Sequence, residues 1–405
     1  MEITPQNYKI KSSCKEHQTT LKGTTSLFPE TDRPIVALDI GYSAVKGYTA
    51  TSMFVFPFFA VEIDKNTSFI GKADPREILY KDTESGRLFR VGEYAERQIS
   101  QDNTSYSTSR DERNRYSTEE FLICARVGIA MAFLTMPDFK GQPPMNFIND
   151  FFLQTGLPTK YLKLDTKRLV AALSGHHKFE VKIADGKMTA FDFTLPEENI
   201  HVAAQPYGTI WNFGFGTTNR YCPVNGTELY NKSILICDIG YGTLDTCEIR
   251  GRSLNAKNTY TSLGMCAVLD RLAQKITDRF EMEANPITIQ KWLEDGKVTG
   301  KAYDENGDLC AVNEDITPLL TEASNEVCAE AIRTIKEKES LKEYDYVIVT
   351  GGTGSAWFNQ LEEALGKGGI RVVSAASADE ETNNTFANVR GYYLSRLMME
   401  NKRKA

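Results

Sequence analysis

The chain has 405 residues, of which 41% are hydrophobic and 25% charged, and its formal net charge is −7. This length predicts two or three domains, each large enough to bury a core. An acidic chain without a long basic run is not expected to bind nucleic acid directly, and the longest apolar stretch, from Phe121 to Leu134, is interrupted by Arg126 and too short to cross a bilayer.

The eight cysteines are scattered, without a C-x-x-C pair or a zinc-binding spacing. Cys124 and Cys237 lie in apolar contexts, which predicts buried thiols in a reducing compartment. Residues 1–33 lack the apolar segment of a secretory signal. We therefore expect a cytoplasmic protein with no membrane partner, and we expect the adjacent His176 and His177, in a polar stretch, to face solvent rather than bind metal.

The first half of the chain begins with an extension, residues 1–33, that is rich in Lys, Thr and Ser. It can be a flexible arm or a segment that docks on a neighbouring subunit. Two or three strands are expected within residues 35–61, short strands and an exposed loop (102–111) within 62–116, and a strand at 147–153. The capping pattern Ser117-Thr-Glu-Glu120 predicts a helix that ends near Thr135, and its apolar residues lie nearly all round it, so it should be buried.

The second half alternates strands and helices. Asp185-Gly186 predicts a hairpin between residues 179–183 and 188–193. His201 to Pro206 is interpreted as a strand end entering a turn, and residues 208–232 as a surface insertion because no helix-forming run follows Gly214-Phe215-Gly216. Helices are expected after Gly264 to about 280, at 286–297, 316–339 and 386–399, with strands at 346–350 and 371–373. This alternation predicts an α/β protein.

One pattern occurs twice, about two hundred residues apart: an apolar run that ends in Asp39-Ile-Gly41-Tyr42 and one that ends in Asp238-Ile-Gly240-Tyr241. Each is typical of a buried strand followed by a tight turn. A single such turn is most simply a hairpin without a ligand, but two copies indicate two related domains. Facing hairpins of this kind could hold a polyphosphate on backbone N–H groups, with Mg²⁺ near the two carboxylates.

A third motif, Gly351-Gly352-Thr353-Gly354, follows the apolar run 346–350. Backbone without Cβ atoms permits the close approach of a base or ribose. It is not a Walker loop, because no Gly-Lys-Ser/Thr follows.

In this order, the three motifs resemble the two phosphate motifs and the adenosine motif of the actin, sugar kinase and heat-shock chaperone superfamily. The chain is most similar to bacterial actin-like ATPases of the ParM type, over roughly residues 35–398. The resemblance implies an actin-like fold of two related α/β domains, each a mixed sheet with helices, flanking a nucleotide cleft. It places domain I at 34–205 plus 378–398 and domain II at 206–377.

The resemblance also assigns roles to residues. Asp39 and Asp238 would hold the Mg²⁺ shell, mostly through water, and would form the catalytic group with Gln205. Contacts with ATP or GTP are implied for Gly41, Tyr42, Ser43, Lys46, Gly240, Gly242, Thr243, Gly264, Gly351, Gly352 and Thr353. A solvated strand lysine is an equally open interpretation of Lys46.

Gln205 departs from the ParM pattern, in which a catalytic Glu stands at this place. A Gln cannot act as a general base but can orient the attacking water, which implies slow basal hydrolysis. The alternative is that Gln205 is a loop residue before Pro206.

The implied function is a cytoskeletal nucleoside triphosphatase that polymerises head to tail. It would segregate plasmid DNA through a DNA-binding adaptor protein bound to a centromere-like site. Two alternatives stay open: a sugar-type kinase of the same superfamily, although no sugar pocket is evident within residues 60–160, and a nucleotide-binding scaffold that does not polymerise.

Overall fold

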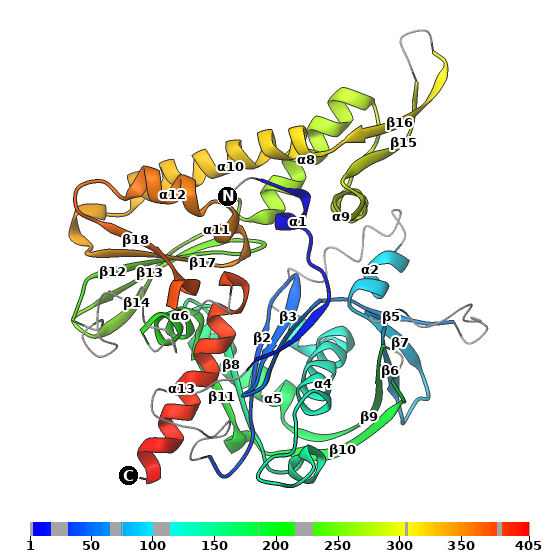
Figure 1. Ribbon diagram of the computed structural model, residues 1–405, viewed down its shortest axis with the longest axis vertical. Helices are drawn as coiled ribbons and strands as arrows, with labels where there is room; N and C mark the ends of the chain where they lie inside the picture. The colour runs from blue at the N-terminus through cyan, green and yellow to red at the C-terminus, as the bar shows by residue number, and fades with distance from the viewer. Residues whose placement is uncertain are drawn as a thin grey trace. The chain divides into compact units, whose positions relative to one another are not determined.

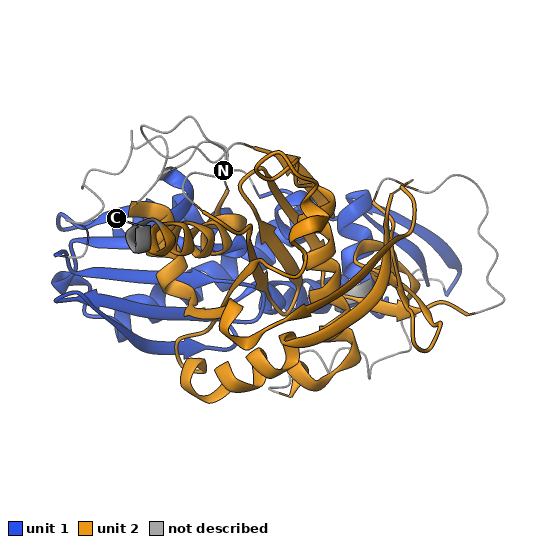
Figure 2. Cartoon of the chain, turned by 90° about the horizontal axis from the view of Figure 1, so that it is seen from below, with its two compact units in different colours: residues 1–10, 224–377 blue, residues 11–223, 378–405 orange. Residues whose placement is uncertain are grey.

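The computed structural model describes residues 3–17, 31–64, 74, 76–99, 114–184, 186–214, 229, 231–303, 307–378 and 383–404. These residues form several sheets with helices between their strands (Figure 1), which confirms the predicted α/β class. The chain divides into two compact units (Figure 2): unit 1 comprises residues 1–10 and 224–377, and unit 2 comprises residues 11–223 and 378–405. Compared with the expected boundaries, residues 1–10 join unit 1 and residues 206–223 belong to unit 2.

The main sheet of unit 2 is mixed and has six strands in the order β1-β4-β3-β2-β8-β11. In chain order these are β1 (Ser13–Glu16), β2 (Ile35–Ile40), β3 (Ala44–Tyr48), β4 (Ser52–Pro57), β8 (Phe152–Leu157) and β11 (Ile200–Ala204). β2, β8 and β11 run parallel, whereas β2, β3, β4 and β1 pair antiparallel. The strand expected at 147–153 is displaced, because residues 144–147 form a 3₁₀ turn before β8.

Unit 1 repeats this topology in a sheet of order β14-β13-β12-β17-β18. Its strands are β12 (Ile234–Ile239), β13 (Leu244–Arg250), β14 (Ser253–Tyr260), β17 (Tyr346–Thr350) and β18 (Arg371–Ser374). As in β4-β3-β2-β8-β11, two antiparallel pairings are followed by two parallel ones. The two copies of the Asp-Ile-Gly-Tyr pattern therefore end corresponding strands, β2 and β12, of two sheets with the same topology.

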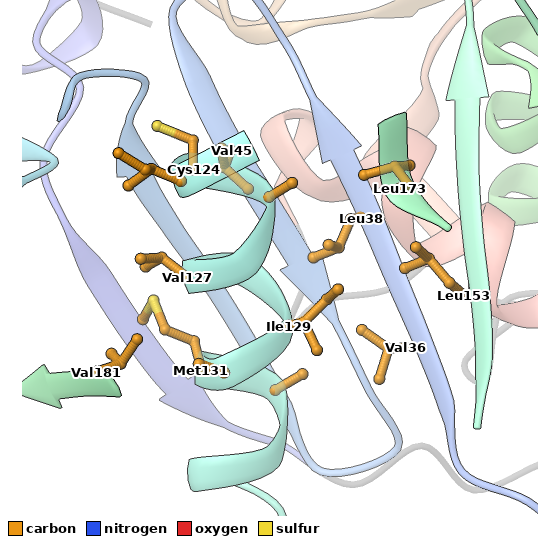
Figure 3. Packing of buried hydrophobic residues seen from close by; sticks show 14 of the residues in the cluster. Val36, Leu38, Val45, Cys124, Val127, Ile129, Met131, Leu153, Leu173 and Val181 are labelled. Atoms are coloured by element: carbon orange, nitrogen blue, oxygen red, sulfur yellow. The ribbon is translucent and has the colours of Figure 1, made fainter. Parts of the chain in front are cut away.

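Helix α4 (Glu119–Leu134) is buried against β2 and β3, as its apolar sequence predicted. Figure 3 shows side chains of α4 packed toward those of Val36, Leu38 and Val45. Thr118, and not Ser117, caps the helix: its side chain accepts a hydrogen bond from the Phe121 N–H at 3.2 Å.

The other helices of unit 2 are α2 (Glu93–Gln98), α5 (Leu162–Leu173), α6 (Gln205–Gly214) and α13 (Ala387–Lys404). The prediction of a surface insertion at 208–232 was wrong for residues 208–214, which are buried in α6. A Cβ at Gly391 of α13 would overlap the carbonyl oxygen of Gly208, so the two helices approach backbone to backbone. Leu229, which also falls in that expected insertion, is buried. Residues 215–228 and 230 lie outside the described residues, as does the expected loop 102–111.

A second sheet of unit 2 has the order β10-β9-β6-β7-β5. Its strands are β5 (Ala60–Glu62), β6 (Ile78–Asp82), β7 (Leu88–Val91), β9 (Gly175–Ile183) and β10 (Thr189–Leu195), and the predicted hairpin β9–β10 is confirmed. The expectation that His177 faces solvent was wrong, because its side chain is buried and its Nδ1 accepts a hydrogen bond from Arg126 Nε at 3.2 Å.

The helices of unit 1 are α1 (Pro5–Tyr8), α8 (Met265–Phe280), α9 (Pro286–Asp295), α10 (Thr317–Lys338), α11 (Gly352–Ala356) and α12 (Phe358–Leu365), and β15 (Lys297–Tyr303) and β16 (Leu309–Asp315) form a separate hairpin. Short 3₁₀ turns elsewhere in the chain cover Arg115–Ser117, Pro144–Phe147, Glu197–Asn199, Leu341–Glu343, Ala375–Ala378 and Asn384–Phe386.

The start of the chain is not a free arm over residues 3–17. Tyr8 is 1% exposed in the core of unit 1, and its hydroxyl is hydrogen-bonded to Ser324 and to the Trp357 indole. Five residues further on, β1 pairs with β4 of unit 2. Residues 18–30 lie outside the described part of the chain.

Across the described residues, no helix combines the length and the apolar character that crossing a bilayer requires.

Candidate functional site

The first hairpin brings three of the predicted site residues into contact. Asp39 in β2 lies directly across from Lys46 in β3, and Lys46 Nζ is 3.2 Å from Asp39 Oδ2. Gln205, the first residue of α6, donates from Nε2 to Asp39 Oδ1 at 3.4 Å. The Asp39 side chain is only 4% exposed, so this carboxylate is held between a cation and an amide at the end of its strand.

The turn after β2 also contacts a buried arginine that the sequence analysis missed. The Gly41 N–H closes the turn on Ala44 O at 2.9 Å, and Arg115 donates to Gly41 O at 2.7 Å. The Arg115 guanidinium lies over the rings of Tyr42 and Phe58, at 4.7 Å and 4.5 Å from their centroids. The available signal was a lone arginine two residues before the predicted capping pattern at Ser117, but it did not indicate this contact.

The second hairpin, in unit 1, is fixed by the N-terminus of α8. The Met265 and Cys266 N–H groups donate to the carbonyls of Gly240 and Tyr241 at 3.1 and 2.7 Å. Because a trans peptide places its N–H opposite its C=O, the N–H groups of Tyr241 and Gly242 point away from α8. Adjacent N–H groups that point out of a turn are typical of a phosphate-binding site.

Asp238 corresponds to Asp39, but its neighbour across the hairpin differs. Asp238 lies across from Asp245, where the first hairpin has a lysine. Asp245 accepts hydrogen bonds from the hydroxyls of Thr243 and Thr259 at 2.7 and 2.6 Å. Asp245 was not predicted as a site residue, because these hydrogen bonds form only in the folded chain.

The comparisons with known proteins match this architecture. Residues 37–208 match the family model described as the N-terminal domain of actin-like proteins. No match was found among curated proteins.

Solved structures match over almost the whole chain. A non-polymerisable quadruple mutant of pCBH ParM matches with a TM-score of 0.64 and 21% identity, over 91% of this chain and 100% of the other. A 15-stranded ParM filament from Clostridium botulinum matches with a TM-score of 0.64 and 17% identity, over 92% of this chain and 100% of the other. An archaeal actin homologue in complex with ADP matches with a TM-score of 0.56 and 13% identity, over 90% of this chain and 99% of the other.

The chain has the actin-like fold.

Within this actin-like chain, the third motif packs against the second hairpin. The Thr353 hydroxyl donates to Gly240 O at 2.9 Å, which adds a third donor to the carbonyls of that turn. Gly351 has a φ of +85°, and a Cβ there would overlap Ile239 O and lie 2.8 Å from Asp238 Oδ1. Gly352, between them, is the first residue of α11.

The remaining predicted glycines fall into two kinds. Gly264 caps α8, and a Cβ there would lie 2.6 Å from Tyr241 O, so packing against the hairpin requires this glycine. At Gly242, a Cβ would meet no atom of the described chain within 4 Å. Packing within the fold therefore requires a glycine at position 264, whereas the space around Gly242 is open.

The acidic residues present are compatible with a hydrated metal ion rather than a protein cage. No cluster of three or more His, Cys, Asp or Glu side chains that could hold a metal occurs within the described ranges. Mg²⁺ keeps several waters and uses one or two carboxylates. Because both oxygens of Asp39 already accept from Lys46 and Gln205, contact through water suits this carboxylate better than direct ligation.

Proposed function

We propose that this actin-like chain binds and hydrolyses ATP or GTP with Mg²⁺ and assembles into filaments that segregate plasmid DNA. One observation carries the proposal. Two Asp-Ile-Gly-Tyr turns end corresponding strands of two sheets of the same topology, each with its carboxylate one residue before the end of the strand.

Phosphate binding is assigned to the turns. In the second hairpin, the outward N–H groups of Tyr241 and Gly242 donate to phosphate oxygens. In the first, Lys46 and Arg115 bring positive charge to a turn that has an acidic residue beside it. Asp39 and Asp238 would hold Mg²⁺ through its waters, and the bound ion would neutralise charge on the phosphates.

Water activation is assigned to Gln205. An amide cannot remove a proton at neutral pH, but it can orient a water molecule by hydrogen bonds. The contact with Asp39 fixes the amide group of Gln205 at the start of α6. Hydrolysis by the free subunit should therefore be slow.

Filament assembly and its use are proposed from the fold. The matched Clostridium botulinum ParM is itself a filament, and another matched structure is described as the Alp12 filament. We propose that this chain assembles in the same general way in the cytoplasm. A DNA-binding adaptor bound to a plasmid centromere-like site would link it to DNA, because the chain carries a net charge of −7.

The test is right-angle light scattering after addition of ATP–Mg²⁺ or GTP–Mg²⁺, with phosphate release followed in parallel. A rise in scattering that decays as phosphate appears would support the proposal. Asp238→Ala should abolish hydrolysis, whereas Asp192→Ala, which removes an exposed carboxylate of β10, should leave it unchanged. Phosphate release without scattering would overturn the filament, and full activity of Asp238→Ala would overturn the site.

A further inference from the structure

The β15–β16 hairpin of unit 1 carries an exposed apolar pair. Figure 1 shows the two strands extending beyond α8, α9 and α10. Tyr303 and Leu309 are direct cross-strand neighbours at its far end, and they are 66% and 56% exposed. Residues 303–315 contain five acidic residues and no basic one, and β15 adds the exposed Lys297 and Lys301, so the hairpin sequence is acidic on balance.

The base of this hairpin is firmly packed, so the exposure of its far end is not fraying. Val298 is fully buried, and the Trp292 indole donates to Thr299 O at 3.0 Å. A Cβ at Gly300 would overlap the end of the Met282 side chain. Exposed apolar side chains on a hairpin whose base is packed against the protein are typical of a contact surface.

A complementary surface lies on α5 of unit 2. Leu164, in the first turn of α5, is 61% exposed, and the nearby side chains of Lys163, Lys167 and Arg168 are exposed and basic. Asp165, the acidic residue in this stretch, is 2% exposed and does not offset their charge at the surface. Tyr303, Leu164 and Leu309 are the three most exposed large hydrophobic residues in the described part of the chain.

We propose that the β15–β16 hairpin of one copy docks on α5 of the next copy. This inference rests on the proposed filament and names its contact. The occupant is a second copy because the two surfaces match in both respects: an acidic hairpin with two exposed apolar side chains, and a basic helix with one. Two different surfaces on the same chain make a heterologous contact that continues from copy to copy instead of closing, and their opposite charges favour this register.

The first experiment removes the apolar side chains. Tyr303→Ser, Leu309→Ser and Leu164→Ser should each raise the critical concentration for nucleotide-driven assembly about tenfold, since each removes one buried apolar side chain from the contact. Met188→Ser is the matched control, because Met188 is also exposed, at 37%, but lies on neither surface. Thermal unfolding of all four variants should match the wild type. An unchanged critical concentration in the three contact variants would overturn the inference.

The second experiment exchanges charge. Asp308→Lys/Glu314→Lys reverses the sign of the charge on the hairpin, and Lys163→Glu/Lys167→Glu reverses the sign of the charge on α5. Each double variant alone should fail to assemble at wild-type critical concentration, whereas an equimolar mixture should assemble, because every hairpin then meets a helix of opposite charge. A mixture that assembles no better than either variant alone would overturn the inference.

The third experiment locates the contact directly. Cys310 is exposed, next to Leu309. Neighbouring side chains of a strand point to opposite faces, so the probe is Leu309→Cys in place of Cys310: Leu164→Cys/Leu309→Cys/Cys310→Ser should give covalent dimers and longer ladders on mild oxidation, and the control Leu164→Cys/Cys310→Ser should not. A cross-link within one chain, or none, would overturn the inference. Wild-type protein that forms no filaments while the ladders still appear would instead overturn the proposed filament and leave the contact standing.

Discussion

Gly242→Ala should separate nucleotide binding from folding. A Cβ at this position would meet no atom of the described chain within 4 Å, and Gly242 does not have a left-handed φ. The N–H groups of Tyr241 and Gly242 point away from α8, toward the side where we place the phosphates. A methyl group would therefore leave the hairpin intact and stand beside the donors.

The two effects differ in size. Replacing a glycine by alanine without strain stabilises a fold by about 0.4–1 kcal/mol, because the unfolded chain loses freedom. A hydrogen bond to a charged group contributes about 1.5–3 kcal/mol. If the methyl group displaces one phosphate oxygen from its donor, nucleotide affinity should fall by about tenfold or more.

The assay is a pair of measurements on the same protein: urea unfolding for stability and titration calorimetry with ATP–Mg²⁺ and GTP–Mg²⁺ for affinity. Gly264→Ala is the matched control, because its Cβ would lie 2.6 Å from Tyr241 O and should destabilise the fold by about 1–3 kcal/mol. A stable Gly242→Ala variant with wild-type affinity would refute the assignment of this turn to phosphate binding.

Three further predictions concern other parts of the chain. Tyr8→Ala should lower the free energy of unfolding by about 3 kcal/mol or more, since it empties a fully buried aromatic position, and urea unfolding would detect this; a change below about 1 kcal/mol would contradict the packing of α1. Burial lowers the pKa of His177 to about 4 from 6.5, so the unfolded chain binds this proton more tightly. Stability should be insensitive to this group above pH 6.5 and should fall by about 2 kcal/mol between pH 7 and 5; His177→Asn should reduce that slope, and an equal slope would refute the assignment. Gln205→Ala should slow phosphate release and lengthen filament lifetime in light scattering, whereas loss of assembly would indicate a folding role at the start of α6.

The strands that end in the two turns could be predicted from sequence, because an apolar run that stops at Asp-Ile-Gly-Tyr has few alternatives. Helix α6 could not. Its sequence contains Gly208 and Gly214, which disfavour a helix in isolation, and its stability comes from burial against α13, nearly two hundred residues later. Gly208 lowers the helix propensity of this segment, and it also permits the close approach of α6 to Gly391 of α13.

The site residues divide in a similar way. Residues in the turns themselves carry a local pattern, so they could be predicted as candidates. Arg115 and Asp245 could not, because a lone arginine before a helix and an acidic residue in a strand have many possible uses. Arg115 is hydrogen-bonded to Gly41, 74 residues away in the sequence, and Asp245 to Thr259, 14 residues away. Hydrogen bonds between residues that are distant in the sequence are visible only in the structure.

The repeated topology makes the difference between the hairpins meaningful. At the same cross-strand position, the first has Lys46 opposite Asp39 and the second has Asp245 opposite Asp238. A second carboxylate beside a phosphate would repel it, but the oxygens of Asp245 accept from two threonine hydroxyls. If both turns bind phosphate as proposed, the second hairpin would do so through its backbone, whereas the first would add a side-chain cation. It follows that salt should weaken the contribution of the first hairpin to nucleotide affinity more than that of the second.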